Sequence, residues 1–412
     1  MTKKFLYFFL LFAYYNTAGQ QSAVPVPVVC HADLNDAFTQ ILRNSDRQLR
    51  RTPTSKIEVT YTDFPDVAKT AFEQAVGIWE EILISNQPIR INAKWESIDG
   101  TTLAFSGASR IFRNTDNVPY TDVWYVGPLA EAIGGRDLNN GDFDINVTLN
   151  SNINWSFGTN GAVFSGRFDL ITVVLHEIAH GLGFSSSMKL INDDSEGQWG
   201  QSGFPYIYDV FLINNDKKVL TSSIDFVNPS SEMKNQLISN DLFFNVSNIK
   251  YANSLPKIFS PSPFRSGGSI SHLDESSYPT GTIHSLMSPS IRAAESNHIP
   301  GELVLSMLNQ IGWPVNNLEN ARILATEEQE LEVLVYPNPS VSQIAVAVPI
   351  GLRTKETRIK LASIDGKVVI DQNIDTIEKA TFYLSLEQLT PGVYFLNFQS
   401  DLKKFTRRIV KY

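Results

Sequence analysis

Two histidines and a glutamate stand close together in one apolar segment of the chain. They are His176, Glu177 and His180, within the run LHEIAHGLGF at 175–184. In a helix His176 and His180 are separated by about 40° around the axis and one turn along it, so both imidazoles can reach one metal ion. Glu177 beside them can accept a proton from a water on that ion without being a ligand itself. This spacing predicts a zinc-dependent hydrolase.

A catalytic zinc site generally has three protein ligands and one water. The chain has six histidines and one cysteine, Cys30, which excludes an intrachain disulfide framework and a four-cysteine metal site. A third ligand must therefore be a further histidine or an oxygen donor. An aspartate ligand from Asp193 or Asp194 stays open. A thermolysin-type glutamate fits less well, because Glu196 is only sixteen residues from His180 in a Gly/Asp-rich loop.

The run from His176 to Gly183 resembles the HExxHxxG part of the metzincin metallopeptidase signature. In that signature a third histidine lies three residues beyond the glycine, and Ser186 stands there instead. The leishmanolysin-like branch separates this histidine from the glycine by a long insertion and follows it with the methionine of a Met-turn. Ser271-His272-Leu273-Asp274, followed by Ser285-Leu286-Met287-Ser288-Pro289, resembles that pattern.

The resemblance implies a site made of His176, His180 and His272 as zinc ligands, with Glu177 as the general base. His284 is the alternative third ligand. Met287 would form an apolar floor beneath the metal. The implied reaction is peptide hydrolysis by a zinc-bound water that Glu177 activates.

Strands and helices alternate in the segment that must position these residues. Residues 57–61 and 89–95 alternate apolar and polar side chains and predict strands, and 66–83 has the apolar spacing of a helix. Helices are also predicted at 169–182 and 300–311, and a strand at 144–149. The predicted fold is α+β: a metzincin-like domain with a twisted mixed sheet, an active-site helix and a C-terminal helix, over residues 55–322 with an insertion at 185–268. By similarity, 144–149 would be the edge strand that pairs with substrate.

The N-terminal residues have the pattern of an exported protein. Lys3 and Lys4 precede an eleven-residue apolar run and then small residues, which predicts a signal peptide at 1–19 and no stable membrane span. Residues 20–54 are predicted to be a leader or pro-segment. Cys30 lies in that segment, and the resemblance implies a latent form in which its thiolate caps the zinc.

Several oxygen-bearing side chains are concentrated in one short loop: Asp137, Asn139, Asp142 and Asp144, around Gly141. This composition suits Ca²⁺, which takes six to eight oxygen ligands. A solvated turn explains the same residues equally well.

The C-terminal part has a different texture. After an acidic linker at 323–333, residues 334–412 contain short alternating strands separated by turns such as Asp365-Gly366, which predicts a small all-β sandwich. VYPNP at 335–339, DGKV at 365–368, LTPGVY at 389–394 and a basic ending at 403–411 resemble the C-terminal sorting domain of the type IX secretion pathway. The resemblance implies export across an outer membrane and contact with the secretion machinery.

Composition limits the remaining function classes. The 412 residues are 42% apolar and carry a net charge of -9, the wrong sign for a nucleic-acid-binding protein. The sequence thus predicts a secreted or cell-surface zinc endopeptidase acting on proteins or peptides. The alternatives are an adhesin or binding protein on a degenerate peptidase scaffold, and a zinc hydrolase acting on a non-peptide amide.

Overall fold

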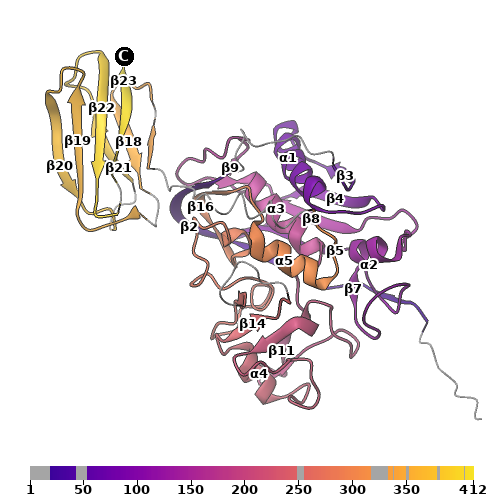
Figure 1. The fold of residues 1–412 in the computed structure, drawn as a ribbon. Helices are drawn as coiled ribbons and strands as arrows, with labels where there is room; N and C mark the ends of the chain where they lie inside the picture. The colour runs from indigo at the N-terminus through magenta and orange to yellow at the C-terminus, as the bar shows by residue number, and fades with distance from the viewer. Residues whose placement is uncertain are drawn as a thin grey trace, which may run out of the picture.

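The computed structural model describes residues 19–42, 53–247, 255–316, 333–336, 338–348, 352–377, 381–402 and 404–412. Apart from Gly19 and Val333, the predicted signal peptide and linker lie outside these ranges. The described residues form a mixed α/β part and a C-terminal β-sandwich (Figure 1). Among them, no helix is long and apolar enough to cross a membrane.

A six-stranded mixed sheet organises the first part. Three strands are parallel to one another, the fourth is antiparallel to them, and two more extend the sheet beyond it. In spatial order the strands are β16 (Ser290–Asn297), β2 (Val28–Ile41), β5 (Thr102–Ala108), β8 (Ile145–Asn150), β4 (Ile89–Glu96) and β3 (Ile57–Thr62).

Two helices, α1 (Asp66–Ile82) and α3 (Leu170–Gly181), pack on each other beside this sheet (Figure 1). The Trp79 indole N–H on α1 donates a 3.2 Å hydrogen bond to the Leu175 carbonyl on α3. Helix α5 (Gly301–Ile311) follows β16, and just after it the Trp313 indole donates to the Leu182 carbonyl at 2.7 Å. The apolar spacing of these three helices placed their bounds within two residues of the observed ones.

The structure corrects the predicted start of the first domain at residue 55. Strand β2 comes from the predicted leader, yet it lies inside the sheet between β5 and β16. Its Cys30, Ala37 and Phe38 are fully buried. Earlier still, β1 (Gln21–Ala23) pairs with β6 (Ile111–Arg113). The Pro/Val composition of 24–29 indicated an extended chain, but its partners are strands distant in sequence.

The predicted edge strand at 144–149 is also wrong as an edge. It forms β8, which has β4 on one side and β5 on the other, so its backbone groups are already paired. Next to β8, the antiparallel strand β5 pairs with β8 on one side and with β2 on the other.

The remaining short elements of the first part lie between the strands and helices already named. The predicted insertion at 185–268 contributes seven of them, which share the main core through buried side chains such as Phe211 and Phe244. The elements are β7 (Tyr125–Val126), α2 (Gly127–Gly134), β9 (Trp155–Ser156), β10 (Phe168–Asp169), β11 (Lys189–Ile191), β12 (Glu196–Gln198), η2 (Asp209–Phe211), β13 (Leu212–Asn214), α4 (Ser231–Leu237), β14 (Leu242–Phe244), β15 (Lys257–Ile258) and η3 (Ser285–Met287).

The C-terminal part has the predicted sandwich architecture, with Ile344, Leu361 and Leu396 buried between two sheets. One sheet has the order β17-β18-β21 and the other β20-β19-β22-β23. The strands are β17 (Leu334–Tyr336), β18 (Gln343–Ala347), β19 (Thr357–Ser363), β20 (Val368–Ile374), β21 (Thr381–Ser385), β22 (Gly392–Gln399) and β23 (Lys404–Lys411).

Candidate metal centre

Helix α3 carries the two-histidine motif and is fixed at its first turn by a buried carboxylate. Asp169 caps the helix, accepting hydrogen bonds from the Thr172 backbone N–H at 2.9 Å and from its hydroxyl at 2.7 Å. The His298 ring contacts the same carboxylate oxygen at 2.7 Å. Such a cap satisfies N–H groups that have no partner inside the helix. All twelve residues of α3 are buried, so His176, Glu177 and His180 are held in a rigid element.

The chain turns sharply after α3, and glycines make the turn possible. At Gly181 a Cβ would lie 2.4 Å from Ile145 Cγ2, so no larger residue fits against β8. Gly183 has φ of +109°, a backbone conformation that side chains with a Cβ rarely adopt. The turn carries the chain to Phe184, whose carbonyl oxygen accepts a 2.6 Å hydrogen bond from His180 Nδ1.

Ser186, which occupies the sequence position of the expected third histidine, has a structural role. Its hydroxyl donates to the buried Asp209 carboxylate at 2.6 Å, and its backbone N–H donates to the Ser271 hydroxyl at 3.0 Å. The excursion of the chain therefore starts and ends at one place, and the residue after Ser271 is His272. The hydrogen bond between Ser186 and Ser271 thus closes the segment between His180 and His272 at one point.

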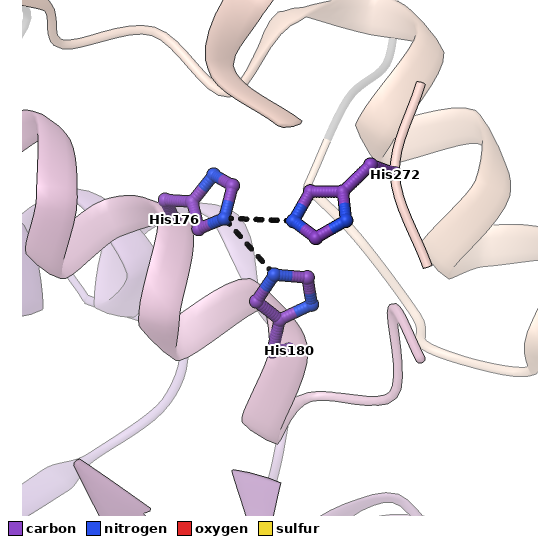
Figure 2. Close-up of side chains that lie close together, drawn as sticks. All are labelled: His176, His180 and His272. Carbon is purple, nitrogen blue, oxygen red and sulfur yellow. Dashed lines mark hydrogen bonds between the residues drawn. The ribbon is translucent and has the colours of Figure 1, made fainter. Parts of the chain in front are cut away.

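The rings of His176, His180 and His272 converge (Figure 2). Nε2 of His176 lies 3.0 Å from Nε2 of His180 and 3.3 Å from Nε2 of His272. Tetrahedral zinc with Zn–N bonds near 2.0–2.1 Å needs its nitrogen ligands about 3.3 Å apart. The spacing of these donors fits such an ion.

The outer ring nitrogens fix the tautomer of all three histidines. Nδ1 of His176 contacts the Leu286 carbonyl oxygen at 2.7 Å, and Nδ1 of His272 contacts that of Gly268 at 2.6 Å. Since a carbonyl only accepts, each Nδ1 carries the proton and each Nε2 presents a lone pair to the shared centre. Burial lowers the pKa of His176 to about 4 and of His272 to about 3, and that of His180 falls well below its ordinary value. Three neutral donors facing one point in the interior suit a cation.

Glu177 lies beside this cluster, and among the described residues no cationic group pairs with its carboxylate, whose side-chain neighbours are the Cys30 thiol and the Ser106 hydroxyl. It is fully buried, and burial raises its pKa to about 8. A hydrogen bond from the Ser106 hydroxyl on β5 to the Glu177 carbonyl fixes its backbone, at 2.7 Å. A fully buried carboxylate without a cationic partner is costly in a purely structural role.

Cys30 reaches the same place from β2. Its sulfur, a His176 ring nitrogen and a Glu177 carboxylate oxygen all lie within 4.8 Å of one another. Burial, and then the charge of Glu177, raises the pKa of the thiol well above its usual value. The structure thus brings Cys30 to the histidine motif, from which it is separated by about 145 residues in the chain.

Met287 lies in the turn η3, whose backbone contacts His176 and the residue after His272. Its side chain is fully buried, and its carbonyl accepts a 2.9 Å hydrogen bond from the N–H of Leu273, next to His272. The preceding carbonyl, that of Leu286, is the partner of His176 Nδ1. The turn therefore orients His176 and the segment next to His272 through its backbone, while Met287 fills the core.

The alternative third ligands lie elsewhere. His284 is not part of the histidine group, and its ring stands edge-on to Tyr278 with centroids 6.0 Å apart. Asp193 and Asp194 are exposed in the turn between β11 and β12. Glu196 on β12 accepts a hydrogen bond from Asn192 at 2.5 Å.

The loop predicted to bind calcium does not assemble its carboxylates around one point. Within the described residues, the metal-capable groups are the histidine cluster and the Cys30 group, and neither includes Asp137, Asp142 or Asp144. Asp142 is exposed, whereas Asp144 is buried and accepts hydrogen bonds from the Arg90 backbone N–H and the Asn139 amide, both at 2.7 Å. The loop is held by these internal bonds.

Asp144 instead has a carboxyl neighbour that the sequence reasoning missed, Glu131 on α2. Burial, and then the charge of Asp144, raises the pKa of Glu131 from 4.5 to about 8, and burial also raises that of Asp144. The Glu131 carboxylate accepts a 2.9 Å hydrogen bond from the Leu138 N–H.

Glu131→Gln should make the stability of the protein less sensitive to alkaline pH. A raised folded-state pKa means that stability from Glu131 is complete below pH 4.5 and is lost as pH rises through about 8. When the pH rises from 5 to 8, the free energy of unfolding of the wild type should therefore fall about 1 to 3 kcal/mol more than that of the variant. Urea unfolding at both pH values measures this, with exposed Glu232→Gln as the control. If wild type and variant differ in free energy of unfolding by the same amount at pH 5 and pH 8, Glu131 is ionised in the folded protein at both pH values.

Comparisons with known proteins identify the C-terminal part. Residues 334–412 match the family model of the secretion system C-terminal sorting domain, and residues 138–246, which include the histidine motif, match the model described as SPBPB7E8-like. No curated protein matches the chain.

The solved structures that match include one that is similar over a small part of the chain. It is a DUF3244 family protein with an immunoglobulin-like β-sandwich fold from Bacteroides vulgatus, 15% identical, covering 19% of this chain and 84% of that one, with a TM-score of 0.18. With the sorting domain at residues 334–412, the protein is exported by the type IX secretion system to the extracellular space or cell surface.

Proposed function

We propose that the protein is a zinc-dependent endopeptidase that hydrolyses peptide bonds in proteins or peptides outside the cell. The observation that carries the proposal is the convergence of three neutral Nε2 donors beside a fully buried carboxylate, that of Glu177. A binding protein on a decayed scaffold would have no use for that carboxylate. The resemblance of the motif to metzincin peptidases supports the same reaction class.

The roles of the residues follow from their positions. His176, His180 and His272 would hold zinc, which supplies a Lewis acid for the scissile carbonyl and for the attacking water. Glu177 accepts a proton from that water while the oxygen of the water bonds to the carbonyl carbon. Glu177 then delivers a proton to the amide nitrogen as the C–N bond breaks. The backbone bonds at each Nδ1 keep the three rings in the required orientation.

We also propose that the protein is latent while β2 is in place. Strand β2 pairs antiparallel with β5 from Val28 to His31, as an extended substrate would pair with the outer strand of the sheet. Its Cys30 then lies against His176 and Glu177. A substrate cannot reach these residues until β2 leaves, so the predicted pro-segment role of residues 20–54 is kept even though the segment is part of the fold.

One experiment tests activity and latency together. Wild type and Cys30→Ala should each bind near one zinc per chain. Cys30→Ala should cleave casein at least about tenfold faster, because β2 then loses the thiol that holds it against the zinc, leaves its place more often and admits water and substrate. A chelator should abolish the cleavage. Val29→Ala, on the same strand, controls for lost packing.

The outcomes separate the two proposals. Equal cleavage by wild type and Cys30→Ala would contradict latency through the thiol. Folded protein without zinc and without cleavage would contradict the peptidase and favour the binding-protein alternative. Zinc with hydrolysis of small amides but not of peptides would favour the non-peptide hydrolase.

A further inference from the structure

Strand β2 changes partner directly beside the metal centre. Up to His31 it pairs with β5, and from His31 onward it pairs in parallel with β16. The place of β2 is therefore bordered by β5 up to His31 and by β16 from His31 onward. In this register Asp33, three residues after Cys30, stands opposite Arg292.

The Asp33 and Arg292 side chains form an ion pair across the two strands. Arg292 Nε lies 3.2 Å from Asp33 Oδ2, and the side chains are 22% and 21% exposed, respectively. The pair is therefore partly shielded from water. Charges in such a place attract each other more strongly than charges on an open surface. It holds the segment of β2 that follows Cys30.

Arg292 also has contacts outside β2, although β2 is the strand that pairs with its own strand β16. The Arg292 backbone N–H donates to Glu295 at 2.9 Å, and its guanidinium lies 3.4 Å from Glu275. It also lines a pocket of about 990 Å³, together with Glu275 and Phe259 among others. If β2 were displaced, the guanidinium would lose one acidic partner and keep the other. A fixed guanidinium with free donors binds a carboxylate well.

We propose that Arg292 selects an acidic side chain in the substrate. The substrate occupies the place of β2 with the same chain direction, and its Asp or Glu lies three positions downstream of the residue that takes the place of Cys30. Asp33 is thus an internal copy of the preferred substrate residue. The inference rests on the proposed peptidase function and names a substrate class for it.

The first test needs no catalysis. Backbone amide exchange of residues 28–41 should become about tenfold faster in Asp33→Asn and in Arg292→Ala, because the strand opens more often. The double variant Asp33→Arg/Arg292→Asp should restore the slow exchange. Arg90→Ala, which breaks ion pairs with Glu58 and Asp137 on the far side of the sheet, is the matched control. Unchanged exchange in both single variants would overturn the inference.

The second test reads the preference itself. The peptides carry Glu or Gln three positions downstream of the residue that takes the place of Cys30. Zinc-loaded Cys30→Ala should cleave the Glu peptide with a kcat/KM about tenfold higher than that of the Gln peptide. Arg292→Ala in that background should remove the difference, Arg292→Lys should keep part of it, and Arg292→Asp should favour Lys at that position.

Failure of this inference differs from failure of the proposed function. Equal cleavage of the Glu and Gln peptides would overturn the role of Arg292 and leave the peptidase standing. No cleavage of any peptide by the zinc-loaded protein would contradict the peptidase, and the substrate preference with it.

Discussion

Glu177→Gln should keep close to one zinc per chain and lose roughly 10²–10⁴-fold of the peptide hydrolysis rate, the usual contribution of a general base. The amide has the same shape and fits the same buried space. It carries no negative charge and cannot accept a proton from water. The three histidines and the backbone bonds at their Nδ1 atoms are untouched, so metal binding should persist.

The measurement is zinc content and casein hydrolysis on the same samples, in the Cys30→Ala background. Glu131→Gln is the matched control, because Glu131 is another buried glutamate, on α2 and outside the metal centre. Retained hydrolysis in Glu177→Gln would rule out Glu177 as the base. Loss of zinc from this variant would show that the carboxylate holds the metal.

His272→Ala should weaken zinc binding at least about 100-fold, because a tetrahedral site then keeps two of its three protein ligands. Ser186→Ala and His284→Ala should retain zinc. The Ser186 hydroxyl is committed to Asp209, and His284 stands outside the histidine group. Ser186→Ala therefore tests the residue at the position of the third histidine in the metzincin signature. His272→Ala tests the residue whose ring lies beside His176 and His180.

Competition with a chromophoric chelator gives the zinc affinities, and circular dichroism confirms that each variant is folded. Equal affinity in His272→Ala and wild type would contradict the assignment of the third ligand. If zinc affinity falls in His284→Ala and in none of the other variants, His284 is the third ligand.

The sequence by itself determined the local features of this protein. The apolar period of 3.6 residues defined α1, α3 and α5, and the spacing of His176, Glu177 and His180 put their side chains on one helix. The alternating strands and turns of 334–412 defined the sandwich. Each of these signals depends on residues that are near one another in the chain.

Only the tertiary structure decided the long-range features. It brought His272 to the motif, because Ser186 and Ser271 close the insertion at one point. It also placed β2 between β5 and β16, so that Cys30 faces Glu177 and Asp33 faces Arg292. A strand's partners and register depend on backbone pairing with distant segments and leave little trace in its own residues. The sequence therefore contained the chemical groups of the site, and the pairing of distant strands determined which of them meet.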